Sequence, residues 1–430
     1  MKKSLIALAA LAATASFAQS SVTLSGAVDV AYATRNVQAA DGSSIGKSTG
    51  ISEGQNTANR INFTMTEDLG SGLKAGAMVE MGLNITNGQL VSSRAGAAGI
   101  QAVNAGSTTA EIPVGSYTTA TNRQSYVFTN GGFGEVRAGY TRTNLYEQST
   151  FSGYLVGQEQ YGSLLHTFGN SVFGGTRGNG LTWITPSMNG FKATLQYGAG
   201  ADRETTTTDA ASGLNGATNA TLKRTGIKID YNNGPLNLAY GRTNVTAKTV
   251  AGSGATTPNT VTTGVGTGAI AGNYVVQNIF GAPATVTAAD YKSNLNQFTG
   301  SYEIGALKLA AQYLKGKKDD AAATKDLDYK ASVLGGIYTI GNVGLFASVG
   351  QGTVTKEDGS KSQDIKQQQI GVRYSLSKRT VAYVMTGTSK DTGTGAAATA
   401  AAYSSGILTG GSTGNVAKAT VTAIGMMHSF

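Results

Sequence analysis

The sequence predicts an all-β fold: a transmembrane, antiparallel, up-and-down β-barrel of about sixteen strands. Three features lead to this prediction. Apolar and polar residues alternate with a period of two in many segments, short and long connections alternate along the chain, and an export signal is followed by no run of about 18 apolar residues. Without such a run no membrane helix forms, and a closed barrel is the remaining way to pair every backbone group inside a bilayer.

The amino-terminal 18 residues have the parts of a signal peptide. Lys2 and Lys3 form a positive start, and residues 5–15 are apolar but too few to span a bilayer as a helix. Small residues then precede the expected cleavage after Ala18, which leaves residues 19–430 as one barrel domain of 430 − 18 = 412 residues. The alternative, an uncleaved anchor helix, is disfavoured by the short apolar stretch.

The composition suits many strands joined by turns. Glycine is frequent, with 60 residues against 5 prolines, and charged residues make up only 13% of the chain. With no cysteine there is no disulfide framework and no thiolate metal site, and the two histidines, His166 and His428, lack ligand-like neighbours, so we expect no cofactor and no metal. The net charge of +9, or +7 without Lys2 and Lys3, would suggest nucleic acid in a cytosolic protein, but the export signal argues against that partner.

Strand-like alternation is clearest at 60–65, 73–81, 191–197, 307–313 and 370–376. In the third of these, Phe191, Ala193, Leu195 and Tyr197 alternate with Lys192, Thr194 and Gln196. A soluble sandwich has the same alternation, so the connections between strands decide between the two folds.

Seven short turns and eight long polar segments alternate strictly along the chain. The short turns are expected at 68–71, 130–133, 186–189, 232–235, 303–305, 341–342 and 377–379. The long segments are expected at 36–56, 85–119, 143–175, 200–221, 247–290, 317–326, 355–363 and 391–415. Fifteen connections give about sixteen strands of about ten residues, with both ends on the short-turn side, as in outer-membrane barrels with short periplasmic turns and long extracellular loops.

In such a barrel, the face opposite the lipid-facing residues lines the lumen. Parity places Arg60, Lys74 and Glu80 on this inner face. It also favours Arg123, if Tyr126 and Phe128 face the lipid, and Arg137, which alternates with Val136 and Ala138. More basic than acidic groups on the wall would bias a channel toward anions.

Several spaced blocks resemble a known family. They lie at 20–29, 59–80, 122–127, 132–134, 374–380 and 428–430. Together they resemble the Gram-negative porins, in particular the general porins of betaproteobacteria of the neisserial and Comamonas–Bordetella type. Two positions depart from the family pattern: Ser25 stands where the family commonly has Tyr, and Tyr140, after Gly139, where it commonly has Arg.

The resemblance implies a sixteen-stranded barrel, a homotrimer, and a third long loop, here 143–175, that folds into the lumen and narrows it. It implies no cofactor and no reaction. It makes Arg177 another basic residue of the constriction, and it places Glu147 and Glu159 inside loop three, where they could face the basic wall. Acidic loop residues opposite basic wall residues would create a transverse field that favours polar solutes.

The expected partners follow from an outer-membrane location and from the aromatic carboxy-terminal residue. They are outer-membrane lipid and lipopolysaccharide, small hydrophilic solutes and anions, and the barrel-assembly machinery, for which the terminal Phe430 would be a signal. The predicted function is an outer-membrane channel for passive diffusion. A substrate-specific channel or a surface adhesin on the same barrel stays open as an alternative. An outer-membrane enzyme is disfavoured because such enzymes need a histidine-assisted site at the rim.

Overall fold

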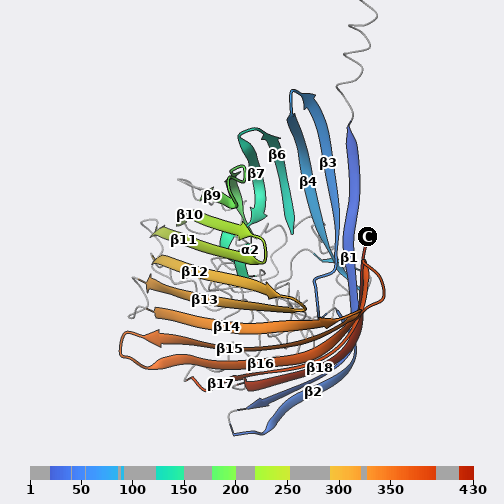
Figure 1. Ribbon diagram of the computed structural model, residues 1–430. Helices are drawn as coiled ribbons and strands as arrows, with labels where there is room; N and C mark the ends of the chain where they lie inside the picture. Colours follow the sequence, from blue (N-terminus) through green and yellow to red (C-terminus); the bar gives the residue numbers. More distant parts are fainter. Residues whose placement is uncertain are drawn as a thin grey trace, which may run out of the picture.

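A computed structural model of the chain describes residues 20–39, 41–53, 55–85, 89–91, 123–149, 177–199, 218–251, 291–320, 327–393 and 416–430. Nearly all of these residues lie in strands (Figure 1). Among them, no helix is long and apolar enough to cross a membrane.

The described strands form one antiparallel sheet. Their bounds are β1 (Ser21–Ala39), β2 (Ser44–Glu53), β3 (Arg60–Gly70), β4 (Leu73–Asn84), β5 (Gln89–Val91), β6 (Gln124–Gly131), β7 (Gly134–Arg142), β8 (Arg177–Ile184), β9 (Phe191–Ala199), β10 (Thr218–Asn233), β11 (Leu236–Ala251), β12 (Tyr291–Ile304), β13 (Leu307–Asp320), β14 (Leu327–Ile340), β15 (Val343–Lys356), β16 (Lys361–Ser375), β17 (Thr380–Asp391) and β18 (Val416–Ser429). A short helix, α2 (Asn144–Ser149), follows β7.

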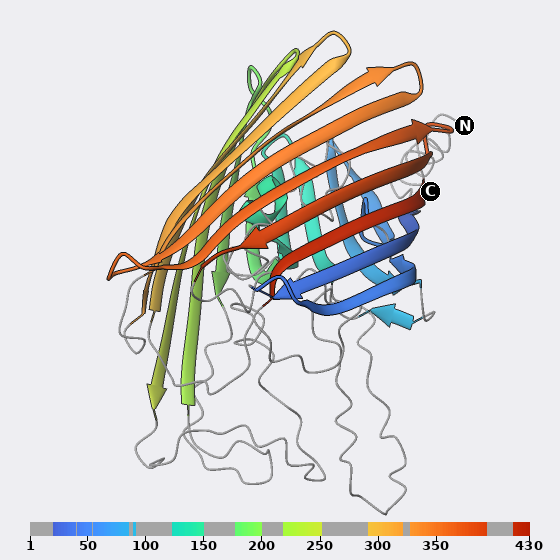
Figure 2. The same cartoon turned by 90° about the horizontal axis from the view of Figure 1, so that it is seen from below.

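The sheet closes on itself, because β1 pairs with β18 from Ala27↔Ser429 to Ala39↔Val416. On its other edge β1 pairs with β2 and with β3, so these two segments share one position in the barrel. In the same way β5 and β6 share the position beside β4. The described strands therefore fill 18 − 2 = 16 positions, which confirms the predicted closed antiparallel barrel (Figures 1 and 2).

The turns between hairpin strands at one end of the barrel are tight. Gly70, Ser71 and Gly72 between β3 and β4 all have positive φ, at 83°, 52° and 77°. This left-handed backbone favours glycine, and it explains why a Gly-Ser-Gly sequence separates two strands here. The first strand, β1, begins at this end of the barrel and the last strand, β18, finishes there, as the alternation of connections predicted.

An apolar belt surrounds the barrel, and β16 shows where it ends. Tyr374, Val372 and Ile370 point outward and are 46%, 42% and 61% exposed, whereas the next outward residues of this strand are the polar, exposed Gln368 and Lys366. A porin-type belt is only about 25 Å tall. Pairing continues beyond it, so the parts of the long strands past the belt form a β-sheet collar outside the hydrocarbon layer.

This collar corrects part of the sequence prediction. Most of 355–363 is strand, because β15 runs to Lys356 and β16 starts at Lys361. Segment 36–56 contains the last four residues of β1 and all of β2, joined as a hairpin. Strands reach 19 residues in β1 and 16 in β10 and β11, so the expected length of about ten was too short.

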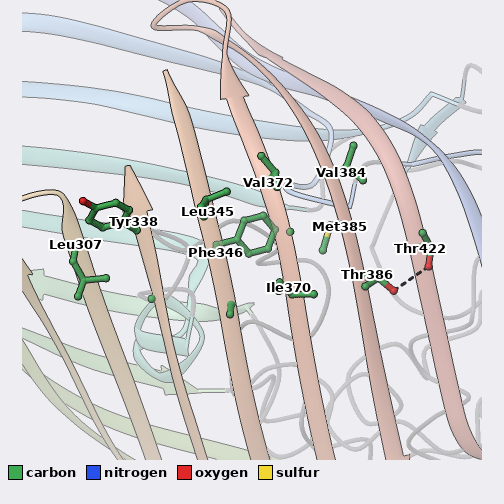
Figure 3. Close-up of a pocket in the computed structure, with 13 residues that line it drawn as sticks. Leu307, Tyr338, Leu345, Phe346, Ile370, Val372, Val384, Met385, Thr386 and Thr422 are labelled. Atoms are coloured by element: carbon green, nitrogen blue, oxygen red, sulfur yellow. Dashed lines mark hydrogen bonds between the residues drawn. The ribbon is translucent and has the colours of Figure 1, made fainter. Parts of the chain in front are cut away.

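The outward face of β13–β18 also carries an open apolar groove of about 630 Å³ (Figure 3). It exists because two small residues, Gly336 and Ala347, are cross-strand neighbours. Tyr338, Leu345 and Ile370 rise around them. The groove faces the lipid, away from the lumen.

Loop three begins inside the barrel. Gln148 of α2 donates from Nε2 to the carbonyl oxygens of Ala239 and Gln297, at 3.0 and 2.8 Å, on the inner faces of β11 and β12. Leu145 of α2 is 0% exposed and packs in an apolar cluster with Leu295 and Leu314 of the opposing wall. The described start of loop three thus lies against the inner wall, as predicted; residues 150–175 lie outside the described part of the chain.

Candidate pore constriction

Glu80 of β4 is the centre of a buried cluster of charges on the inner wall. Its side chain is 1% exposed. Oε1 accepts a hydrogen bond from Arg123 Nε, and Oε2 accepts from Gln124 Nε2 at 2.7 Å and from Arg142 Nη2 at 3.0 Å. Arg177 Nη2 lies 3.7 Å from Oε1. One carboxylate therefore holds three guanidinium groups together.

Arg142 and Arg177 come from two strand ends. Arg142 is the last residue of β7 and Arg177 the first of β8, and they are partners in the strand register. Their side chains bend to Glu80 because the alternation of the sheet no longer fixes direction where the chain leaves it. The ring of Tyr146 in α2 lies under the Arg177 guanidinium, with Cζ 5.3 Å from the ring centroid, so loop three contacts the cluster directly.

Arg123 is where the sequence placed it, but the parity argument for it was wrong. Tyr126 and Phe128 of β6 do not face the lipid. Phe128 packs over Gly76 on the inner face, and Arg137 Cζ lies 4.9 Å from the centroid of the Tyr126 ring. The outward residues of β6 include Val127, which is 59% exposed. Arg123 precedes the first residue of β6, and its salt bridge to Glu80 fixes its direction.

Arg60 extends the cluster toward the long-loop end of the barrel. It faces Gly82 of β4, two residues beyond the Asn62–Glu80 pair, and so shares the inner face with Glu80. Its Nη1 donates to Thr57 Oγ1 at 3.0 Å and to the Ala58 carbonyl at 2.9 Å. We use the term basic cluster for Arg60, Arg123, Arg142 and Arg177 with Glu80. Four guanidiniums and one carboxylate give 4 − 1 = +3.

The other predicted wall residues lie elsewhere. Arg137 faces inward but forms a salt bridge with Glu135, toward the short-turn end. Lys74 is exposed at the second position of β4, opposite Asp68, and so lies at the rim beside the first short turn. Neither residue contacts Glu80.

Glu147 of α2 forms a salt bridge with a lysine of β10. Its Oε2 lies 3.6 Å from Lys228 Nζ of β10, which also lies 3.4 Å from Asp230 Oδ2. Glu147 therefore faces basic residues of the inner wall, with its salt bridge on β10. Glu159 lies outside the described residues.

Sequence reasoning missed several inward basic residues, among them Arg142, Lys228 and Arg224. Arg142 stands two positions after Tyr140, the residue that replaces the family's arginine, and Lys228 alternates with Ile227 and Ile229. Arg224 is 8% exposed, with Nη1 against the backbone of Gly178. The family commonly has an arginine at position 140, and this could have directed attention to Arg142. Lys228 and Arg224 could have been found because they occupy alternate positions on the same face of β10.

The opposite wall is mainly uncharged at the same level. Inward side chains of β12–β17 there are buried amides and hydroxyls: Gln297, Thr299, Gln312, Ser348, Gln367 and Gln369. At this level the charged side chains of the lumen thus lie mainly on one side, from β1 through β3, β4, β6, β7 and β8 to β10.

A closed barrel with an apolar outer belt and a polar, asymmetrically charged inner face defines a channel protein of an outer membrane. The family model described as "Gram-negative porin" matches residues 5–394, and the chain belongs to that family. Outer membrane porin protein 32 of Delftia acidovorans is 29% identical over 398 residues, which cover 89% of this chain and 88% of that protein.

Solved structures agree on the fold. The anion-selective porin from Comamonas acidovorans superposes with a TM-score of 0.62 at 20% identity, over 96% of this chain and 100% of that one. OmpT of Vibrio cholerae, in its trimer form, gives a TM-score of 0.56 at 14% identity over 96% and 99% of the two chains. The resemblance seen in the sequence blocks is confirmed, and with it the outer-membrane location.

Proposed function

We propose that the barrel passes small hydrophilic solutes and ions by passive diffusion, with a preference for anions set by the basic cluster. The observation that carries this proposal is the arrangement at Glu80, where one buried carboxylate leaves most of the arginine charge unbalanced. Guanidinium groups keep their charge at any workable pH, so this positive potential is permanent. The similar Comamonas protein is described as anion-selective, which agrees with the proposal.

The test is the reversal potential of the purified protein in a planar bilayer under a KCl gradient. We expect an anion preference in the unaltered channel. The variant Arg60→Gln with Arg123→Gln should shift the reversal potential toward cation permeation, because fixed charges at a narrow point act within the Debye length of about 10 Å at 0.1 M salt. The shift should shrink near 1 M salt, where that length is about 3 Å.

Lys317→Gln with Lys318→Gln is the matched control. It removes the same number of charges, from the outer part of β13. Lys317 is exposed there and lies 3.6 Å from Asp328. This control should shift the potential much less. Equal shifts from both pairs, or none from the arginine pair, would place the selective charges outside the basic cluster.

We further propose that the native state is a homotrimer in contact with lipopolysaccharide, assembled by the barrel machinery, that the protein catalyses no reaction, and that residues 1–18 are removed on export. The trimer form of the structurally similar OmpT supports the oligomeric state. Amino-terminal sequencing of protein from isolated membranes should read from Gln19. A read from Met1 would reject the cleavage.

A further inference from the structure

A short segment between β2 and β3 lies inside the barrel. We call residues 55–59 the inner strap. Gln55 and Asn59 in it are 2% and 5% exposed. The strap reaches β17, where the Gln55 amide donates to Tyr383 Oη at 3.1 Å, and β18, where Asn56 Nδ2 donates to Met427 Sδ at 3.2 Å. It therefore covers the seam where the first and last strands of the barrel meet.

Asp29 anchors this strap to β1. The Asp29 side chain points inward, and the residue is 0% exposed. Its Oδ2 accepts hydrogen bonds from the backbone amides of Asn56 and Thr57, at 2.8 and 2.7 Å, and its Oδ1 accepts from Tyr383 Oη at 2.7 Å. The Asp29 amide donates to Asn59 Oδ1 at 2.5 Å. Hydrogen bonds to an ionised carboxylate are among the strongest available to a loop.

The same strap holds the head of Arg60. The two groups that accept from Arg60 Nη1 are Thr57 Oγ1 and the Ala58 carbonyl. Thr57 thus has its amide on Asp29 and its hydroxyl on Arg60. A long arginine side chain has many rotamers, and these two acceptors confine its guanidinium to one place beside Glu80.

We propose that Asp29 is a positioning residue for ion selectivity: it fixes the inner strap, and the strap fixes the Arg60 guanidinium in the lumen. This inference rests on the proposed role of Arg60 in anion preference. The inference predicts a change in anion selectivity opposite to the one expected from charge alone. Removal of an acidic charge should by itself make a pore more anion-selective, whereas loss of Asp29 as an anchor should make this pore less so, because Arg60 becomes mobile.

The experiment compares Asp29→Asn in the unaltered channel and in the Arg60→Gln channel, with reversal potential in a KCl gradient as the readout. Heat-modifiable gel mobility checks that each variant folds. Tyr383→Phe is the milder second variant, because it keeps the ring and removes only the hydroxyl that joins Asp29 and Gln55. A reporter of the strap is available because the chain has no cysteine: the single variant Gln55→Cys, treated with a small charged thiol reagent.

We expect Asp29→Asn to shift selectivity toward cations in the unaltered channel and to add nothing in the Arg60→Gln channel. Labelling of Gln55→Cys should become about tenfold faster with Asp29→Asn, as charge-assisted hydrogen bonds weaken. Tyr383→Phe should move both readouts in the same direction by less. If Asp29→Asn does not fold, Tyr383→Phe alone decides.

Three results would overturn the inference: a shift toward anions, an equal shift in both backgrounds, or no shift despite faster labelling. Each would show that Asp29 acts by its own charge or only on barrel stability. Failure of Arg60→Gln alone to change selectivity is a different result. It would reject the proposed function of Arg60 before the anchor is tested.

Discussion

Phe430 and Gly26 close the barrel as a mutual backbone pair. The Gly26 amide donates to the Phe430 carbonyl at 3.0 Å, and the Phe430 amide donates to the Gly26 carbonyl at 3.2 Å. The Phe430 ring lies on Gly26, where an added Cβ would stand 2.5 Å from the ring Cζ and 2.4 Å from the Arg60 carbonyl oxygen. Phe430 therefore extends the β1–β18 pairing by one residue pair, and a side chain at position 26 would collide with backbone as well as with the ring.

This pair predicts a loss of folded barrel when Phe430 is deleted. The deletion removes two backbone hydrogen bonds at the seam and the ring that covers it, together with the expected assembly signal. Synthesis and export should be unchanged while the heat-modifiable, folded form in the membrane decreases. Gly26→Val should act in the same direction, because its side chain meets backbone as well as the ring. Normal yields of both variants would show that the seam closes without this contact.

Glu80→Gln should make the channel more anion-selective and less stable. Three arginines then lose their shared carboxylate on the inner wall, where Arg123 and Arg177 are 6% and 7% exposed. Breaking a buried charge pair costs about 3–5 kcal/mol, so the barrel should unfold at a lower temperature in a gel-mobility assay. Glu135→Gln, which breaks the more exposed pair with Arg137, is the control and should cost less.

The apolar belt predicts different outcomes for two outward positions on β16. Val372→Arg places a charge between the belt residues Ile370 and Tyr374 and should destabilise the folded protein by about 2–4 kcal/mol. Gln368→Arg, four residues away on the same face, enters the collar and should be close to neutral. Urea unfolding in lipid vesicles measures both. Equal losses would mean that the belt extends higher than its side chains indicate.

Topology can be tested with epitope tags on intact cells. A tag after Asp41, in the turn between β1 and β2, should be accessible because it lies at the end that carries the long connections. Tags within 255–270 and 395–402, which lie outside the described residues, should be accessible for the same reason. A tag between Asp68 and Ser71 should be hidden in the periplasm. Labelling of the last tag alone would invert the orientation.

The fold was predictable because its signal is local and repeated. Alternation such as that from Phe191 to Tyr197 follows from the two-residue period of a strand, and a bilayer permits only a closed sheet of such strands. Turn positions such as Gly70–Gly72 were equally visible, since backbone conformation restricts the residue type there. The ends of the strands were not predictable, because a segment with polar residues on both faces can be a loop or a strand exposed to water. The residues near Lys356 and Lys361 are in strands of the collar.

By itself, then, the sequence determined the barrel, its sixteen positions and the inner face of β3 and β4 at Arg60 and Glu80. The tertiary structure alone decided which arginines meet. Arg123, Arg142 and Arg177 stand at strand ends, where parity gives no direction, and they come together because one carboxylate on β4 attracts all three. It also decided that Asp29 and Tyr383, 354 positions apart, share a hydrogen bond over the seam. Closure of the barrel joins the first strand to the last, and no local pattern encodes that contact.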